Sequence, residues 1–145
     1  MYQHILIATD GSELANKALA QGLELARGLK AQVTVLTVTG PFPMPGYGTI
    51  PAAALVEAYE TATTESAARI LSSATAAATK SGLACDTLHV RHGEPAEAIV
   101  GTGLDKACDL IVMASHGYRG VKQMLLGSVA MKVLTQSKTP VLICR

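Results

Sequence analysis

The chain of 145 residues is poor in aromatic side chains and in net charge. It has no Trp, one Phe and four Tyr, and its 12 Lys and Arg residues are nearly balanced by 11 Asp and Glu residues. A net charge of +1 produces no overall field that would attract nucleic acid or an anionic membrane surface. Few aromatic rings are present on which single-stranded bases would stack. We therefore expect neither a nucleic-acid partner nor a membrane partner.

Cysteine motifs and long apolar runs are also missing. Cys85, Cys108 and Cys144 lie far apart and form no CxxC pair, so the sequence predicts neither a disulfide framework nor a zinc site. We interpret them as buried, unreactive thiols, with a redox or metal role as the alternative. No run reaches the roughly 18 apolar residues that a membrane-spanning helix needs. Because the chain also opens directly on a strand-like segment, we expect a cytoplasmic location.

The chain does have the composition and length of a globular protein. Apolar residues make up 49% of it and charged residues 16%, which is close to the average for folded domains. Its length is that of the commonest single domains. We expect one domain spanning residues 1–145.

Short apolar runs alternate along the chain with segments of helical periodicity. Runs rich in β-branched residues predict strands buried on both faces, and these are His4–Ala8, Val33–Val38, Leu110–Ala114 and Val141–Cys144. A further run, Cys85–Val90, alternates only in part and predicts an edge strand. The helical segments are Ser12–Leu29, with Ser12 as N-cap, Ala52–Ser81, Pro95–Gly103 and Ser128–Ser137. The proline-rich and glycine-rich stretch Gly40–Pro51 is irregular and predicts either a lid over a binding site or a spacer.

This alternation predicts an α/β fold. Parallel neighbours need crossover connections, so we expect a five-stranded parallel sheet with helices on both faces, in the strand order 3-2-1-4-5. In sheets of this kind, ligands bind beyond the carboxyl ends of the strands, where the strand order reverses. The last strand, Val141–Cys144, is then an apolar edge that invites pairing with a second copy. We expect a homodimer through this strand.

Small polar residues and glycines follow the predicted strands at that carboxyl edge. The exit of the first strand carries Asp10, and the exit of the fourth continues as a glycine-bearing loop from Gly117 to Ser128. Glycines let backbone N–H groups approach an anion, and a helix N-terminus adds unpaired amides, so this loop predicts a phosphate cradle. Arg119 and Lys122 are either phosphate partners or solvated residues. The alternative is that Ser128 caps the helix and the glycines form a tight turn.

Other nucleotide and hydrolase motifs are missing. The sequence has neither a Walker loop nor a G-x-G-x-x-G fingerprint. Ser115 and His116 are adjacent and belong to no G-x-S-x-G elbow, so we do not expect a serine hydrolase. The apolar residues that follow the loop predict burial in the core or in a subunit interface; they are Met124, Leu125, Leu126, Val129, Val133 and Leu134.

One glycine pattern does resemble a known family. The run Ser115-His116-Gly117, nine further residues and then Gly127-Ser128-Val129 is similar to the nucleotide-binding signature of universal stress proteins, G-x2-G-x9-G-[ST]. The opening Ile5–Ser12 and the close Thr139–Ile143 resemble the same family. The sequence departs from the pattern at its first glycine, where it has Ala114.

The resemblance implies a Rossmann-like fold of the adenine nucleotide alpha hydrolase type and a pocket for ATP, with or without Mg²⁺. The residues that it implies around the adenosine part are Ala8, Thr9, Asp10, Val38 and Met113. Those that it implies at the phosphates, or on the loop between base and phosphates, are Ala114, Ser115, His116, Gly117, Gly127, Ser128 and Val129. It also implies the homodimer through the last strand.

The function implied is that of a stress-response protein in which ATP acts as a switch for partner contacts. Asp10 is the only obvious carboxylate at the expected site and no general base is evident, so we expect slow hydrolysis at most. The alternative is a dimeric interaction module of the same family that binds no nucleotide, and Ala114 is the residue that separates the two. A nucleotidyl-transfer or ligase relative is a third interpretation, because a fold does not fix a function.

Overall fold

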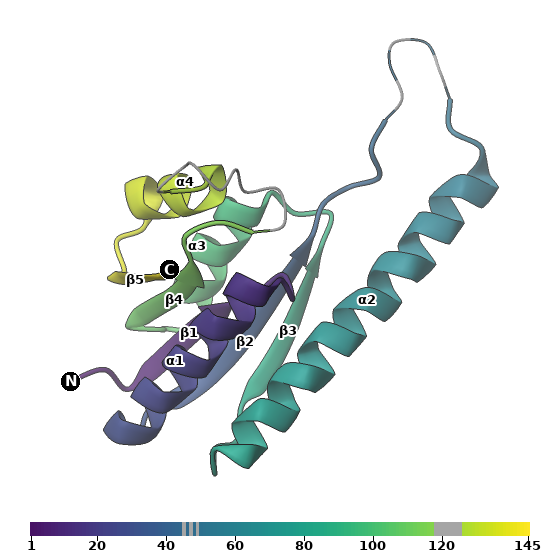
Figure 1. The fold of residues 1–145 in the computed structure, drawn as a ribbon. Coiled ribbons are helices and arrows are strands. Elements are labelled where there is room, and N and C mark those ends of the chain that lie inside the picture. Colours follow the sequence, from purple (N-terminus) through teal and green to yellow (C-terminus); the bar gives the residue numbers. More distant parts are fainter. Residues whose placement is uncertain (45, 47, 49, 118–125) are drawn as a thin grey trace.

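The computed structural model describes residues 1–44, 46, 48, 50–117 and 126–145. Strands and helices alternate along the chain, as Figure 1 shows. The strands are β1 (His4–Ala8), β2 (Gln32–Thr39), β3 (Asp86–Arg91), β4 (Leu110–Ala114) and β5 (Val141–Cys144). The helices are α1 (Glu13–Leu29), α2 (Ala53–Lys80), α3 (Pro95–Asp105) and α4 (Ser128–Gln136).

The five strands form one parallel sheet in the order β3-β2-β1-β4-β5, which confirms the predicted fold class and strand order. Every residue of β4 is buried, as expected of a central strand covered on both faces. No residue of β3 is fully buried, which agrees with its place at the sheet edge. The strand order reverses between β1 and β4, and this fixes where a ligand is expected.

Helices cover both faces of the sheet (Figure 1). On one face, α1 and the C-terminal part of α2 pack on side chains such as Ile7, Val35 and Val112. On the other face, α3 and α4 pack on a second cluster that includes Leu36 and Ile111. Each fully buried aliphatic side chain contributes about 1.5–3 kcal/mol to the free energy of unfolding, so these two clusters dominate stability.

The helix ends decide how the strand exits are oriented. Ser12 caps α1 as predicted, and its Oγ accepts a hydrogen bond of 3.3 Å from the Ala15 N–H. At α4, however, the N-cap is Gly127, and Ser128 is already the first helical residue. The alternative in which Ser128 caps this helix is therefore wrong.

Two of the three thiols, Cys108 and Cys144, are buried. Burial raises the pKa of Cys108 to about 11 and also raises the pKa of Cys144, so both thiols are protonated at neutral pH. Cys85 is half-buried.

Within the described ranges, no cluster of three or more His, Cys, Asp or Glu residues is arranged to hold a metal ion. No helix in that part of the chain has the length and apolar character needed to cross a membrane.

Asp109 joins the beginnings of β1 and β4 at the amino edge of the sheet. Its carboxylate accepts hydrogen bonds from the backbone N–H groups of Gln3 at 2.8 Å and His4 at 3.0 Å. Partial burial by itself would raise the pKa of this carboxyl, but these hydrogen bonds and the nearby His4 outweigh it and lower the pKa below 3.8. The ionised form is therefore the one that the fold favours.

Asp109→Asn is expected to lower the free energy of unfolding by about 1 kcal/mol or more at pH 7, because the amide oxygen can accept from only one of the two backbone N–H groups and the amide nitrogen cannot accept from the other. A carboxyl whose pKa is lowered on folding stabilises the protein above its unfolded pKa and loses that effect as the pH falls through the folded value. The difference between wild type and variant should accordingly shrink below pH 3.8. Urea unfolding at pH 7 and at acid pH measures it. An equal difference at both pH values would contradict this role of the charge.

Candidate functional site

The exits of β1 and β4 meet at the point where the strand order reverses. Gly117, three residues beyond β4, lies directly against the Asp10 carboxylate, two residues beyond β1. A β-carbon at position 117 would overlap Asp10 Oδ2, so this close approach requires glycine. The structure thus brings together two residues that are more than a hundred positions apart in the sequence.

Local hydrogen bonds fix the turn that carries Asp10. Its Oδ1 accepts a hydrogen bond of 2.9 Å from the Ser12 N–H, and the Thr9 hydroxyl accepts one of 3.1 Å from the Gly11 N–H. Gly11 has a φ of +78°, a conformation that side chains disfavour. The Thr9 N–H extends the ladder by donating to Leu36 O at 2.9 Å. The carboxylate is therefore held at the sheet edge in a defined orientation, half-buried.

The exit of β4 is docked onto the beginning of α4. The Gly127 N–H donates a hydrogen bond of 2.6 Å to Ser115 O. A β-carbon on Gly127 would lie 2.9 Å from His116 Cβ and 3.1 Å from Ser115 O, so glycine is needed here as well. Ser115 is 1% exposed, and its Oγ lies 3.0 Å from His116 Nδ1. This burial keeps the hydroxyl from acting as an accessible nucleophile.

The amides at the beginning of α4 differ in what they offer a ligand. The Gly127 N–H already donates to Ser115 O, which corrects the expectation that this amide binds a phosphate. The role of Gly127 is instead to let the beginning of α4 pack closely on Ser115 and His116. The first intrahelical bond runs from the Met131 N–H to Gly127 O at 3.0 Å. The N–H groups of Ser128 and Val129 precede it and have no acceptor within the helix. They are the donors that an anion would meet.

Three residues expected around the adenosine part and one expected at the phosphates lie in one apolar cluster drawn from four elements. Ala8 of β1, Val38 of β2, Met113 of β4 and Val129 of α4 belong to one apolar cluster on the α3 and α4 face of the sheet. Met113 is 6% exposed, whereas Val38 and Val129 are only partly buried. The cluster therefore extends from the core to the carboxyl edge, where it offers apolar surface next to the beginning of α4.

Ala114 lies outside that cluster. It is the last residue of β4, pairs with Cys144 of β5 and is 7% exposed. Its methyl group packs in the core on the α1 face of the sheet, opposite to Met113. Ala114 is also not among the residues with positive φ, so no glycine conformation is required here. The extra methyl group is accommodated by the core rather than by the loop.

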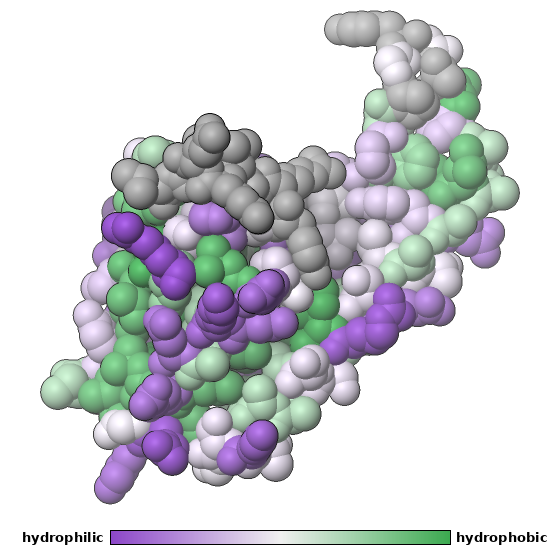
Figure 2. Space-filling view, viewed as in Figure 1, coloured by the Kyte–Doolittle hydropathy of each residue, from purple (hydrophilic) through white to green (hydrophobic). Residues whose placement is uncertain are grey.

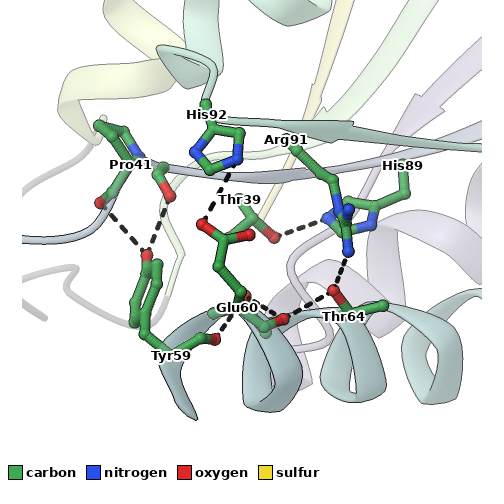
Figure 3. A network of polar contacts seen from close by, with 10 residues as sticks. Thr39, Pro41, Tyr59, Glu60, Thr64, His89, Arg91 and His92 are labelled. Atoms are coloured by element: carbon green, nitrogen blue, oxygen red, sulfur yellow. Dashed lines mark hydrogen bonds and ion pairs between the residues drawn. The ribbon is translucent and has the colours of Figure 1, made fainter. Parts of the chain in front are cut away.

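The exits of β2 and β3 are held by a network of polar contacts with α2, shown in Figure 3. Thr39 Oγ1 lies 2.8 Å from His89 Nε2, and the Arg91 guanidinium donates to the Thr64 hydroxyl. Burial and, to a lesser extent, the charge of Arg91 lower the pKa of His89. His92 Nε2 lies 3.4 Å from Glu60 Oε1.

Sequence reasoning missed the α2 members of this network, because they belong to no motif. They are Tyr59, Glu60, Thr63 and Thr64. Arg119 and Lys122, the two basic residues considered as phosphate partners, lie outside the described residues. Part of the apolar run of the same loop, Met124 and Leu125, does so too.

Comparison with known proteins decides the family. Residues 1–145 match the model of the Universal stress protein family over their whole length. The chain belongs to the universal stress protein family. A curated relative, the universal stress protein YxiE of Bacillus subtilis, is 32% identical, and the alignment covers 100% of both chains. The resemblance seen in the glycine pattern is thereby confirmed.

Solved structures of universal stress proteins share the fold. One, described as a universal stress protein in complex with cAMP, is 28% identical, with a TM-score of 0.73 over 99% of this chain and 97% of the other. A second, the universal stress protein from Archaeoglobus fulgidus in complex with dAMP, is 26% identical, with a TM-score of 0.66 over 99% and 98% of the two chains. Those two universal stress proteins therefore hold adenine nucleotides on this architecture.

Proposed function

We propose that this universal stress protein binds ATP at the carboxyl edge of its sheet, between the exits of β1 and β4. One observation carries the proposal: the N–H groups of Ser128 and Val129, which have no acceptor within α4, lie next to an apolar cluster drawn from four elements. An anion site beside an apolar surface is what a nucleotide needs. The complexes of related proteins with cAMP and dAMP support the choice of an adenine nucleotide.

The residues present fit the parts of the ligand. The adenine ring would pack on Val38 and Met113, and the Asp10 carboxylate would accept hydrogen bonds from the ribose hydroxyls. The N–H groups of Ser128 and Val129, together with the Ser128 hydroxyl, would donate to the phosphates at the positive end of the α4 dipole. Bound Mg²⁺ would neutralise part of the phosphate charge.

The same arrangement favours a switch over a fast ATPase. Rapid phosphoryl transfer requires a residue that positions the attacking water and groups that hold the metal. Asp10 is the one carboxylate in the proposed set, and its Oδ1 is already bonded to the Ser12 N–H. Ser115 is buried. We therefore expect slow hydrolysis at most, and a function in which ATP occupancy changes stability and partner contacts.

A thermal-shift titration tests this proposal. A ligand that binds only the folded state stabilises it by RT ln(1 + [L]/Kd), which is about 2.7 kcal/mol at a hundred times Kd. ATP, with and without Mg²⁺, should raise the melting temperature of the wild type in a saturable way, and Asp10→Ala should abolish most of this shift. Asp105→Ala, at the exposed end of α3, is the matched control and should keep it. The absence of any shift at millimolar ATP would contradict nucleotide binding.

A second candidate function is a dimeric interaction module of the same family without nucleotide. The observation that favours it is the hydrogen bond from the Gly127 N–H to Ser115 O, which removes one expected phosphate donor. The placement of Ala114 in the core argues the other way, because its methyl group does not enter the loop. The titration with ATP separates the two candidates.

We also propose that the protein forms a homodimer through β5. The N–H of Ile111 donates to Pro140 O and that of Ser115 to Cys144 O, both across the β4 side of this strand. Because backbone polar groups alternate in direction along a strand, those of Val141 and Ile143 face the open edge of the sheet. Leu142, on the same edge strand, is 40% exposed. A second copy would pair with these groups and cover this apolar edge.

A further inference from the structure

Tyr59 of α2 contacts the three residues that follow β2. Its hydroxyl donates a hydrogen bond of 2.9 Å to Gly40 O and a longer one of 3.3 Å to Pro41 O. Its ring meets Phe42 edge-on, with the two ring centroids 5.4 Å apart. Figure 3 shows the phenol pointing from the helix to the backbone of this segment. One side chain thus fixes the direction in which the chain leaves β2.

The next residues of α2 fix the exit of β3 in the same way. Glu60 pairs with His92, which has a φ of +56°, and Thr64 accepts a hydrogen bond from Arg91. The two exits are also joined to each other, because the Gly93 N–H donates to Thr39 O at 3.2 Å. A β-carbon at Gly93 would lie 3.0 Å from Val90 Cγ1 and 3.4 Å from Val38 Cγ1, so Gly93 lies beside the ends of both strands. Val38, which is expected to contact the adenine ring, therefore lies next to two strand exits that are both hydrogen-bonded or ion-paired to α2.

Little apolar packing holds this end of α2. The buried residues of the helix are Ala67, Ala74 and Ala78, all of which lie C-terminal to Tyr59. The end nearest the 40–51 segment projects past the sheet in Figure 1, and its exposed apolar residues gather there in Figure 2. Leu55 is 60% exposed. With so little burial, the relative position of this helix end and the β2 exit depends mainly on the polar contacts made by Tyr59 and its neighbours.

We propose that Tyr59 is a positioning residue for the nucleoside part of the ligand. By holding the carbonyl groups of Gly40 and Pro41, it keeps the end of β2, and with it Val38, at the distance that the adenine ring requires. Tyr59 itself does not contact the nucleotide. This inference rests on the proposed ATP binding, and it adds a residue of α2 on which the affinity depends.

The variant Tyr59→Phe tests the inference, because it keeps the ring contact with Phe42 and removes only the hydroxyl. Loss of a hydrogen bond of this type changes an equilibrium by about two- to tenfold. Isothermal titration calorimetry should show Kd values for ATP and for AMP that rise by the same factor, about fivefold, because the loss lies on the nucleoside side. Amide hydrogen exchange at Gly40 and Phe42 should become faster. The matched control is Tyr2→Phe, which removes a phenol hydroxyl near the amino edge of the sheet and should leave both Kd values unchanged.

Three outcomes separate the possibilities. A wild type that binds neither ATP nor AMP contradicts the proposed function, and the inference falls with it. A wild type that binds, together with a Tyr59→Phe variant of lower stability but unchanged Kd values, contradicts the inference alone and leaves Tyr59 as an anchor of α2. A rise in the Kd of ATP without a rise for AMP also contradicts it, because the effect then lies at the phosphates.

Discussion

Gly127→Ala is expected to weaken ATP binding by at least about tenfold, a loss of about 1.4 kcal/mol of binding free energy. The new β-carbon would lie 3.1 Å from His116 Cα and from Ser115 O, which are backbone atoms with little freedom to move. The beginning of α4 must therefore shift away from the exit of β4. This shift breaks the hydrogen bond from the Gly127 N–H to Ser115 O and moves the N–H groups of Ser128 and Val129. Calorimetric titration with ATP measures the loss.

A glycine with open space around it supplies the control for that experiment. Gly28 lies in α1, and nothing is within 4 Å of a β-carbon placed there. Gly28→Ala should keep wild-type affinity and raise the free energy of unfolding by about 0.5–1 kcal/mol, since alanine is the better helix former. Wild-type affinity in Gly127→Ala as well would show that the packing of α4 on Ser115 does not shape the binding site.

Leu142→Lys is expected to convert the dimer into a monomer at micromolar concentration. In a dimer with twofold symmetry, the substitution places two new positive charges at one interface, and lysine on an edge strand opposes pairing with a second strand. Leu142 lies on the edge strand, is 40% exposed and is not part of either buried core cluster. The monomer should therefore remain folded. Sedimentation velocity of wild type and variant, over a range of protein concentrations, measures the association.

Leu55→Lys is the matched control, because it places the same charge on an exposed leucine of α2, away from the sheet edge. This variant should sediment as the wild type does. A wild type that is monomeric at all concentrations, or a Leu142→Lys variant that stays dimeric, would exclude the β5 edge as the interface.

Much of the fold follows from local sequence patterns. Apolar β-branched runs as in β1 and β4 have few alternatives to a buried strand, and the helical segments between them force parallel neighbours. The partial alternation of apolar and polar residues in Cys85–Val90 predicts an edge strand, and β3 does lie at the edge of the sheet. The end of α4 nearest the site was less predictable, since glycine and serine both suit an N-cap and only the backbone conformation shows that Gly127 has this role.

The candidate site was predictable only as far as its residues follow the strands. Asp10 and Gly117 were expected at the same edge because each follows a parallel strand, but their direct contact depends on the path of the loop. The side of the sheet on which Ala114 lies is set by the register of β4, which alternation within a fully apolar run does not reveal. Tyr59 carries no sequence signal at all, because its contact with Gly40 arises from the placement of a long helix beside the strand exits.

The most direct test of the central claim is nuclear magnetic resonance of the ¹⁵N-labelled protein during titration with ATP. If the nucleotide binds as proposed, the amide signals of Ser128 and Val129, which would contact the phosphates, should shift strongly. The signals of Val38 and Met113, which would contact the adenine ring, should shift with the same Kd. Saturable shifts confined to other parts of the sheet, with the signals at the beginning of α4 unmoved, would contradict the account.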